Sequence, residues 1–244
     1  MDKVRQLDDI IAGIKDGATI MFGGFLGVGS PLKSIEKIVA SGVKDLTVVS
    51  VVNSYPGGGF DLAPLFKNRQ VRKFVTAHTG TCPEAVEAMK AGDLDVDFFP
   101  MGTWIEKVRA AGAGLGGVLT PIGLGTLVED GKQRLEIDGK SYLVEMPLRA
   151  DYGFIAGYRA DTMGNVEYRG VSLNSNPVIA TAADFTVAEV NEIVEVGGID
   201  PSRVGTPCLF VDAVVQGHSF AEHQAVFERL WVSTGRLAAP ATAA

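Results

Sequence analysis

Cysteine and histidine are scarce in this chain of 244 residues, which contains two cysteines and three histidines. Two cysteines, Cys82 and Cys208, are too few for the disulfide framework of a small secreted domain. The cysteines and histidines also lack the spacing of zinc ligands, so we expect no metal site. No apolar run approaches the length of a membrane-spanning helix, and residues 1–10 lack the apolar core of a signal peptide. We therefore expect a cytoplasmic protein without membrane contact.

Positive charge is in deficit as well. The chain has 22 lysines and arginines against 29 aspartates and glutamates, which gives a net charge of −7. A nucleic-acid partner needs clustered basic side chains, so this balance argues against one. Hydrophobic residues make up 46% of the chain and charged residues 21%, as is typical of a folded globular protein. The length suits one substantial core and is too short for two generous domains.

Strand-like and helical segments alternate over the first hundred residues. The expected strands are residues 18–22, 46–52, 71–76 and 95–100, and the expected helices are residues 7–14, 31–41, 83–90 and 104–111. Such alternation predicts parallel βαβ units with helices covering the sheet. Later in the chain, strand character resumes at residues 152–157, 185–190 and 209–215.

An Asp-Gly pair interrupts this pattern. Asp138 and Gly139 lie between two segments of alternating polarity, residues 133–137 and 140–145, which is a strong signal for a hairpin. The sequence therefore predicts an α/β fold. We expect an open, mostly parallel sheet flanked by helices, with an antiparallel hairpin excursion.

A glycine-dense loop joins the first expected strand to the helix at residues 31–41. Its glycines are Gly23, Gly24, Gly27 and Gly29. They allow positive φ angles and a close approach of a ligand to the backbone. Ser30 is a good N-cap, Pro31 suits the first helical position, and Gly42 suits the residue after the helix. Free amides beside a helix N-terminus suit an anionic or acyl ligand.

The obvious interpretation of this loop is a dinucleotide fingerprint, which its spacing does not support. No choice of glycines within residues 23–29 gives G-x-G-x-x-G, and the strand at residues 46–52 is followed by Asn53-Ser54 instead of an acidic residue. Gly112, Gly114 and Gly117 match the pattern, but they follow a helix-like segment instead of a strand. We therefore disfavour a nicotinamide-dependent oxidoreductase, which an absence of NAD-linked absorbance change would exclude.

The strand, loop and helix resemble the first signature of the class I coenzyme A transferases, in the half called the α subunit. The matching residues are Asp16-Gly17, Ile20-Met21-Phe22, Gly23-Gly24-Phe25, Gly29 and Pro31. The resemblance covers roughly residues 5–216, with further motifs at residues 112–117, 125–131, 149–151, 161–165, 176–177 and 194–207. Residues 78–83 are similar to the acetate/butyrate–acetoacetate type. Many motifs in the same order support the resemblance far more strongly than any one motif does.

This resemblance implies a reaction and a missing part. Members of the family move coenzyme A between carboxylic acids, here short-chain or 3-oxo acids, through an acyl anhydride and a thioester on a glutamate. That glutamate belongs to the other half, the β subunit, in a Ser-Glu-Asn-Gly-like signature that this chain lacks. We therefore expect half of an active site, completed by a β partner in an α2β2 or larger hetero-oligomer. Coenzyme A would be a co-substrate, with no resident cofactor.

Ten residues form the candidate site for coenzyme A or substrate, and none is expected to be catalytic. They are Gly23, Gly24, Phe25, Leu26, Gly27, Val28, Gly29, Gly112, Gly114 and Asn176. By resemblance, the loop at residues 23–29 lies beside the coenzyme A channel, at the interface between the two halves of the enzyme. Each group also has a structural interpretation: a tight turn for the loop, close packing for Gly112 and Gly114, and helix capping for Asn176.

The other reactive side chains are interpreted as structural. Five glutamates are expected to be solvated charges, namely Glu84, Glu87, Glu106, Glu129 and Glu145. Cys82 follows His78 by four residues, but nothing in the sequence orients the imidazole, so we expect a packed thiol. His218 and His223 are expected at the surface.

Two departures from the family pattern concern the choice of substrate. Met101 stands where the family usually has glutamine, and Leu173 and Ser175 stand where it has arginine and phenylalanine. These changes predict an altered acyl specificity with the same chemistry. The alternative function is a protein of the same fold that binds an acyl-CoA or an anion without catalysis.

Residues 218–244 extend beyond the expected domain of residues 1–217. Ser219 and Glu222 have the spacing of a capping box for a helix at residues 221–232. We expect the apolar face of this helix to pack on the domain or on an oligomer neighbour. The Ala/Pro-rich residues 237–244 are expected to form a frayed tail.

Overall fold

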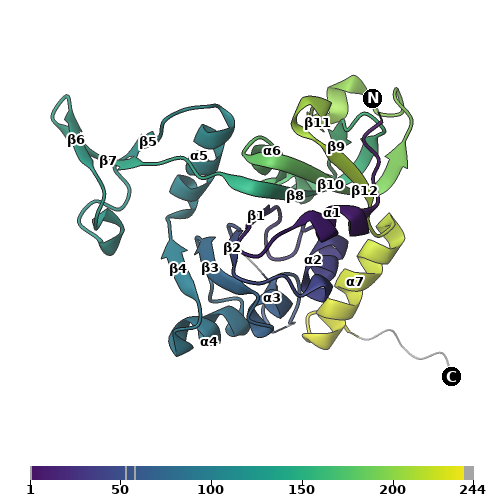
Figure 1. The fold of residues 1–244 in the computed structure, drawn as a ribbon, viewed down its shortest axis with the longest axis horizontal. Coiled ribbons are helices and arrows are strands. Elements are labelled where there is room, and N and C mark those ends of the chain that lie inside the picture. The colour runs from purple at the N-terminus through teal and green to yellow at the C-terminus, as the bar shows by residue number, and fades with distance from the viewer. Residues whose placement is uncertain (1, 53, 58, 239–244) are drawn as a thin grey trace.

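The computed structural model describes residues 2–52, 54–57 and 59–238, and its centre is a mixed sheet of nine strands (Figure 1). The parallel strands lie in the order β4, β3, β2, β1, β8, β10, β12. Their bounds are β1 Thr19–Phe22, β2 Leu46–Val49, β3 Val71–Thr76, β4 Asp95–Phe98, β8 Ala150–Asp161, β10 Ala183–Val194 and β12 Ala213–Gln216. Two antiparallel strands, β9 (Val166–Glu167) and β11 (Val204–Thr206), lie beyond the C-terminal half of β8. The predicted α/β class with a mostly parallel sheet is confirmed.

Alternate residues of each central strand enter two different cores. In β1, Ile20 and Phe22 belong to one core and Met21 to the other, as the period of two in a strand requires. The first face of the sheet is covered by α1 Leu7–Gly13, α2 Leu32–Ser41, α3 Ala63–Lys67 and α4 Pro83–Ala91. The second face is covered by α5 Met101–Gly112 and α6 Asn176–Ala180. The central strands are therefore buried on both sides, which explains their continuous apolar runs.

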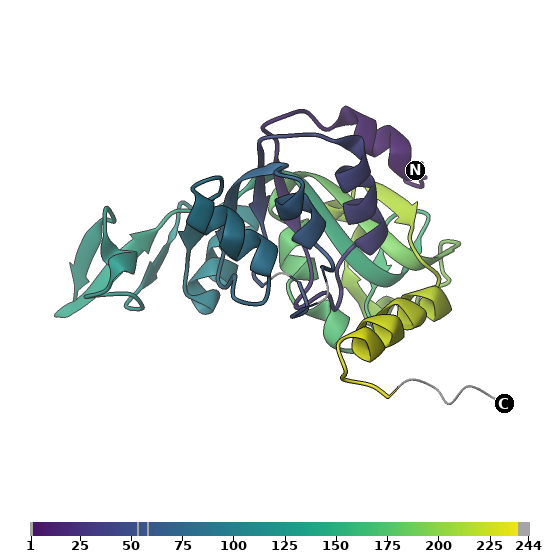
Figure 2. The same cartoon turned by 90° about the horizontal axis from the view of Figure 1, so that it is seen from below.

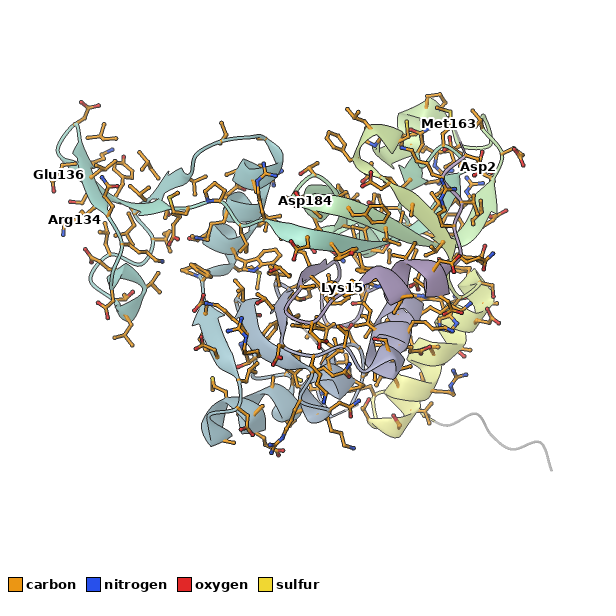
Figure 3. The ribbon with its side chains drawn as sticks, viewed as in Figure 1. Asp2, Lys15, Arg134, Glu136, Met163 and Asp184 are labelled. Carbon is orange, nitrogen blue, oxygen red and sulfur yellow. The ribbon has the colours of Figure 1, made fainter. Side chains whose placement is uncertain are left out.

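A small antiparallel sheet projects from this body (Figures 1 and 2). We call it the arm; its strands are β5 Val118–Thr120, β6 Arg134–Ile137 and β7 Lys140–Glu145. Asp138 and Gly139 form the two-residue turn with φ angles of 51° and 73°, so the predicted hairpin is confirmed. Figure 3 shows Arg134 and Glu136 on β6, far from the main sheet.

A buried ion cluster ties the arm to the body. Glu145, at the end of β7, is only 1% exposed and accepts hydrogen bonds from Lys107 of α5, at 2.9 Å, and from Lys132. Both ammonium groups also lie over the ring of Phe99, 4.4 and 4.9 Å from its centroid. The prediction that Glu145 is a solvated charge is wrong, because Lys107 of α5 and Lys132 of the arm compensate its burial.

Several boundaries differ from the predicted ones. β2 ends at Val49 instead of residue 52, and the expected strand at residues 209–215 begins only at Ala213. Residues 208–210 form a 3-10 turn instead, where Val211 N donates to Cys208 O. Conversely, β8 and β10 run for twelve residues each, because they pair with one another along their full length. The 3-10 helices are η1 Leu127–Glu129, η2 Gly170–Leu173, η3 Pro201–Arg203 and η4 Cys208–Phe210.

The last helix, α7 (Phe220–Ser233), begins with the predicted capping box. Ser219 and Glu222 satisfy each other's backbone amides. The helix packs on the domain through Phe227 and Leu230, as expected. His218 and His223 are half-buried, so the prediction that they are surface residues is wrong; the ring of His223 packs on Phe227 with 5.1 Å between centroids. Of the expected frayed tail, residues 239–244 lie outside the described residues, as does Asn53.

Candidate functional site

The glycine loop lies where an open α/β sheet usually binds its ligand. From β1 the chain moves outward through β2, β3 and β4, and it then returns to the other side of β1 as β8. The order of strands therefore reverses between β1 and β8. Gly23, the first residue after β1, donates its amide to Phe154 O of β8 at 2.9 Å. The loop thus leaves the carboxyl edge of the sheet at a topological switch point, the common position of ligand sites in this architecture.

The tip of the loop is a tight reverse turn. Phe25 N donates to Val28 O and Val28 N to Phe25 O, both at 3.0 Å. Leu26 and Gly27 occupy the two central positions with φ angles of 53° and 82°. A leucine in this left-handed region is strained by about 1–2 kcal/mol, and such strain is concentrated at functional sites. The turn holds Phe25 at the surface, where it is 38% exposed.

The side chain of Asn176 joins this loop to β8 and η2. Its Oδ1 accepts a hydrogen bond from Ala156 N at 3.0 Å, and its Nδ2 donates to Gly29 O at 3.0 Å and to Ser172 O at 2.8 Å. The side chain is fully buried and does not cap α6, whose N-cap is Ser175. The capping interpretation is therefore wrong, because the amide is used by the loop, β8 and η2.

Two asparagine side chains lie so close to the loop backbone that two of its positions leave no room for a side chain. A Cβ on Gly23 would lie 1.8 Å from Asn176 Oδ1, and a Cβ on Gly29 would lie 2.9 Å from Asn174 Nδ2. Asn174 itself accepts from Gly24 N at 3.3 Å and donates to Val28 O at 2.9 Å. Sequence reasoning treated residues 173–175 only as a departure from a pattern and missed this role of Asn174. Its signal was the pair of asparagines flanking Ser175.

The N-terminus of α2 is not available to a ligand. The carboxylate of Glu189, on β10, accepts from Lys33 N at 3.1 Å and from both Ser34 N and Ser34 Oγ at 2.7 Å. Burial raises the pKa of Glu189, while these hydrogen bonds act in the opposite direction. The expected anion site at this helix end is therefore filled by the chain's own carboxylate.

Ser30 does not cap α2 either. The residue before the helix is Pro31, and Ser30 Oγ donates to Asp61 Oδ2 at 3.2 Å. Asp61 is buried beneath the loop, and its Oδ1 has no hydrogen-bond partner among the described residues. Burial raises the pKa of Asp61 to about 7, against the hydrogen bonds from Ser54 and Ser30, which lower it. By contrast, Gly42 ends the helix at a φ of 72°, as predicted.

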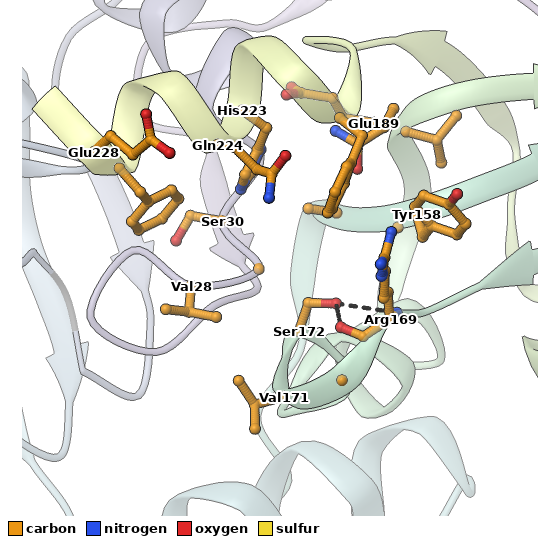
Figure 4. Close-up of a pocket in the computed structure, with 18 of the residues that line it drawn as sticks. Val28, Ser30, Tyr158, Arg169, Val171, Ser172, Glu189, His223, Gln224 and Glu228 are labelled. Atoms are coloured by element: carbon orange, nitrogen blue, oxygen red, sulfur yellow. Dashed lines mark hydrogen bonds between the residues drawn. The ribbon is translucent and has the colours of Figure 1, made fainter.

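Two adjoining cavities lie between the loop, η2 and α7. The smaller, about 310 Å³, is lined by Phe25, Leu26 and Val28 of the loop and by Phe227 and Trp231 of α7. The larger, about 400 Å³, lies on the other side of Val28 and reaches β8 and β10 (Figure 4). In Figure 4, His223, Gln224 and Glu228 project from α7, while Arg169 and Tyr158 lie on the opposite side. The two cavities share Val28, Val171, Phe227 and Trp231.

Gly112 and Gly114 lie elsewhere, at the C-terminal end of α5. A Cβ on Gly112 would lie 1.9 Å from Thr181 Oγ1, so this glycine permits the contact of α5 with the end of α6. Gly114 has a φ of 70° just after the helix. Neither residue lines the two cavities among the described residues, and a second wall of the site formed by them stays a prediction.

Most of the candidate nucleophiles lie where they cannot attack a substrate in either cavity. Burial raises the pKa of the Cys82 thiol to about 11, so it is protonated at neutral pH and packs as expected. Glu87 and Glu106 are exposed, as predicted, whereas Glu84 and Glu129 are half-buried. Among these and the buried Glu145, none lines either cavity in the described part of the chain.

Metal-ligand clusters and membrane-spanning helices are both missing from the described residues. No group of three or more histidine, cysteine or acidic side chains is arranged there to hold a metal ion. No helix in the same ranges combines the length and the apolar character needed to cross a bilayer.

Comparison with known proteins gives the family. Residues 4–217 match the family model described as coenzyme A transferase. The chain is 45% identical over 213 residues to the alpha chain of the acetate CoA-transferase of Escherichia coli K12, covering 87% of this chain and 96% of that protein. It is 38% identical over 214 residues to the alpha chain of the acetoacetyl-CoA:acetate/butyrate CoA transferase of Clostridium acetobutylicum, covering 88% of this chain and 97% of that protein.

The fold agrees with this result. A crystal structure of an acyl-CoA transferase from Escherichia coli O157:H7 superimposes with a TM-score of 0.82 at 22% identity, which shows the shared fold. The match covers 88% of this chain but only 47% of that one, so this chain spans about half of the longer protein. With its family match over residues 4–217 and relatives designated as alpha chains, this protein belongs to the coenzyme A transferase family and is of the α type.

Proposed function

We propose that this chain is the α subunit of a heteromeric enzyme that moves coenzyme A between a short-chain or 3-oxo acyl-CoA and a carboxylic acid. The observation that carries this proposal is the strained turn at Phe25–Val28, held at the switch point of the sheet beside an apolar cavity. The names of the relatives support the substrate class, since they are acetate and acetoacetyl-CoA:acetate/butyrate transferases. Coenzyme A is the co-substrate in this proposal, and no resident cofactor is needed.

The reaction needs a carboxylate nucleophile, which we assign to a glutamate of a β partner. This carboxylate attacks the donor thioester carbonyl, which gives an acyl anhydride and releases the CoA thiolate. The thiolate then attacks the glutamyl carbonyl of the anhydride, which leaves a glutamyl-CoA thioester and frees the donor acid. The acceptor carboxylate repeats the two steps in reverse order. The scheme predicts ping-pong kinetics.

The contribution of this chain is positioning. Two of its buried carboxylates are engaged elsewhere: Glu189 at the N-terminus of α2 and Glu145 with two lysines. Its buried thiol is protonated. The loop, in contrast, is fixed by hydrogen bonds from Asn174 and Asn176, so its tip can orient an acyl group without moving.

The first experiment measures CoA transfer from acetoacetyl-CoA or butyryl-CoA to acetate, with the chain alone and with the β-type protein encoded beside it. We expect transfer only in the mixture, and a thioester trapped by hydroxylamine or borohydride on a glutamate of the partner. Mass measurement of the complex tests the α2β2 or larger assembly. Activity of this chain alone would contradict the assignment of the nucleophile. No transfer across a panel of acids, with acyl-CoA still bound, would favour the binding protein of the same fold.

A further inference from the structure

Helix α7 lies outside the segment that matches the family, residues 4–217, yet it covers the glycine loop. Phe227 of α7 lies beside Gly27, since a Cβ on that glycine would be 3.7 Å from Phe227 Cε1. The ring of Phe227 also packs edge-on against Phe60, with 5.5 Å between centroids, and lies 5.9 Å from the ring of Trp231. The helix therefore brings two large aromatic side chains to the tip of the loop.

We propose that Phe227 and Trp231 form the far wall of the acyl pocket at the loop tip, and that this wall selects an apolar acyl chain and limits its length. This inference rests on the proposed function and deepens it. The acyl group would enter past Phe25 and Leu26 and lie in the smaller cavity, against α7. The class of substrate is a monocarboxylic acid with an uncharged aliphatic chain longer than that of acetate.

The lining of the smaller cavity gives the chemical class. None of the described residues that line it is charged, and loop residues Phe25, Leu26 and Val28 face α7 residues Phe227 and Trp231 across it. A chain of methylene groups would gain from burial here, whereas a second carboxylate would lose its hydration without a cation to replace it. The cavity of about 310 Å³ is at the low end of the range for sites that enclose small ligands.

Two aromatic side chains that line the cavity are partly exposed. Phe25 and Trp231 are each 38% exposed, and both line this cavity from opposite sides. Packing among the described residues leaves more than a third of each of them exposed. An apolar chain between them would bury surface on both, which a role in the core alone does not account for.

The wall is fixed at both ends of the helix. At the N-terminal end, Phe220 packs on Tyr158 with 5.7 Å between centroids, and the guanidinium of Arg169 lies 4.3 Å from the centre of the Phe220 ring. At the other end, Phe227 and Leu230 join Leu32 in a small core. A wall held in this way discriminates by size, since a longer chain cannot push it aside.

The first test is binding, and it does not depend on catalysis. Trp231 is one of two tryptophans, and the other, Trp104, is fully buried in the core of the second sheet face. In the complex with the β partner, we expect hexanoyl-CoA to shift the Trp231 emission to the blue, while coenzyme A without an acyl group does not. The signal of Trp231 is the difference between the native complex and one carrying Trp231→Phe. No shift with hexanoyl-CoA, or an equal shift with coenzyme A, would overturn the proposal.

The second test is the substrate profile, measured as kcat/KM for acetyl-, butyryl-, hexanoyl-, octanoyl- and succinyl-CoA. Native enzyme should prefer butyryl- or hexanoyl-CoA over succinyl-CoA. Trp231→Ala should raise the ratio of octanoyl- to butyryl-CoA by about tenfold, the scale of one methylene group in an apolar pocket. Val171→Trp, which narrows the cavity from the η2 side, should lower the same ratio.

Arg229→Ala is the matched control, because Arg229 is an exposed residue of the same helix that lines neither cavity. Its profile should equal that of the native enzyme. If Trp231→Ala fails to fold, Val171→Trp and the fluorescence shift still decide the question. Unchanged ratios of octanoyl- to butyryl-CoA in both cavity variants would refute the proposed wall. A native complex without any transfer would instead contradict the proposed function, and the fluorescence test of the wall could still be made.

Discussion

The glycine loop and the arm differ in how far the rest of the chain covers their polar and apolar groups. The loop at residues 23–29 is short and mostly buried, and two asparagine side chains take up its polar groups. The arm projects from the body and leaves large apolar side chains uncovered, among them Leu127, which is 88% exposed. The loop is thus rigid because neighbouring segments satisfy it, and the arm depends on its anchor at Glu145. Of these two regions, the loop at the switch point of the sheet is therefore the one that contacts with the body hold in a defined conformation.

The strongest way to break the loop is to remove its clamp. Asn176→Ala leaves Ala156 N, Gly29 O and Ser172 O without their partner in the interior. Each unsatisfied buried group costs about 1–3 kcal/mol, so we expect a loss of about 4 kcal/mol in the free energy of unfolding. Urea denaturation measures it. Gln133→Ala, at an exposed position, is the control and should change stability by less than about 0.5 kcal/mol. Equal stability of both variants would refute the clamp.

The arm is tested at its anchor. Glu145→Gln leaves Lys107 and Lys132 without a counter-charge in a buried place, which should destabilise by about 3 kcal/mol. We expect amide hydrogen exchange to rise across residues 118–145 and to stay unchanged in the loop at residues 23–29. Glu136→Gln, on the exposed side of the arm, should leave both regions as they are. A uniform rise over the whole chain would show that the arm is not a separate unit.

The pH dependence of the free energy of unfolding tests Asp61, which is buried beneath the loop. The pKa of Asp61 is about 7 in the folded chain and near 3.8 in an unfolded one, so the folded state holds a proton that the unfolded state has lost between these values. Stability from this group is therefore fully present below about pH 4 and falls as the pH rises towards 7. Asp61→Asn should remove that slope, with about 1.4 kcal/mol for each pKa unit as the scale. Parallel stability curves of the two proteins from pH 4 to 8 would contradict the prediction.

The smallest expected effect concerns the strained turn. Leu26→Gly relieves a positive φ angle but loses apolar contact and loosens the unfolded chain, so the net change in stability should be less than about 1 kcal/mol. CoA transfer should nevertheless fall, because Leu26 lines the smaller cavity. A comparison of thermal unfolding with kcat/KM separates the two effects. Unchanged transfer would mean that the side chain at the loop tip does not touch the acyl group.

Local signals predicted local structure well. The apolar run at residues 18–22, the left-handed Gly42 and the Asp138-Gly139 turn each specify their own conformation, and the structure has all three. The same holds for the capping box of α7. The family followed from many short motifs in order, which requires no knowledge of contacts.

Contacts between distant segments could not be predicted in this way. Glu189 reaches the amides of α2 across 155 positions of the chain, and Asn176 reaches Gly29 across 147. A capping serine and a solvated glutamate were the reasonable local interpretations of Ser30 and Glu145, and both failed because partners far along the chain were unknown. The candidate loop was therefore placed correctly in the sequence, while the side chains that hold it were found only in three dimensions.

The position of β1 between β2 and β8 also sets the order of assembly. Met21 pairs with Gly153, so the strand that carries the loop waits for a neighbour made some 130 positions later. During synthesis, the side of β1 opposite β2 stays an unpaired edge until β8 emerges, and such edges attract other chains. Parallel pairing over this separation is intrinsically slow. A nascent chain stalled before residue 150 would lack the strand that completes the site and would be prone to aggregate, so we expect the loop to take its final form only after β8 has been made.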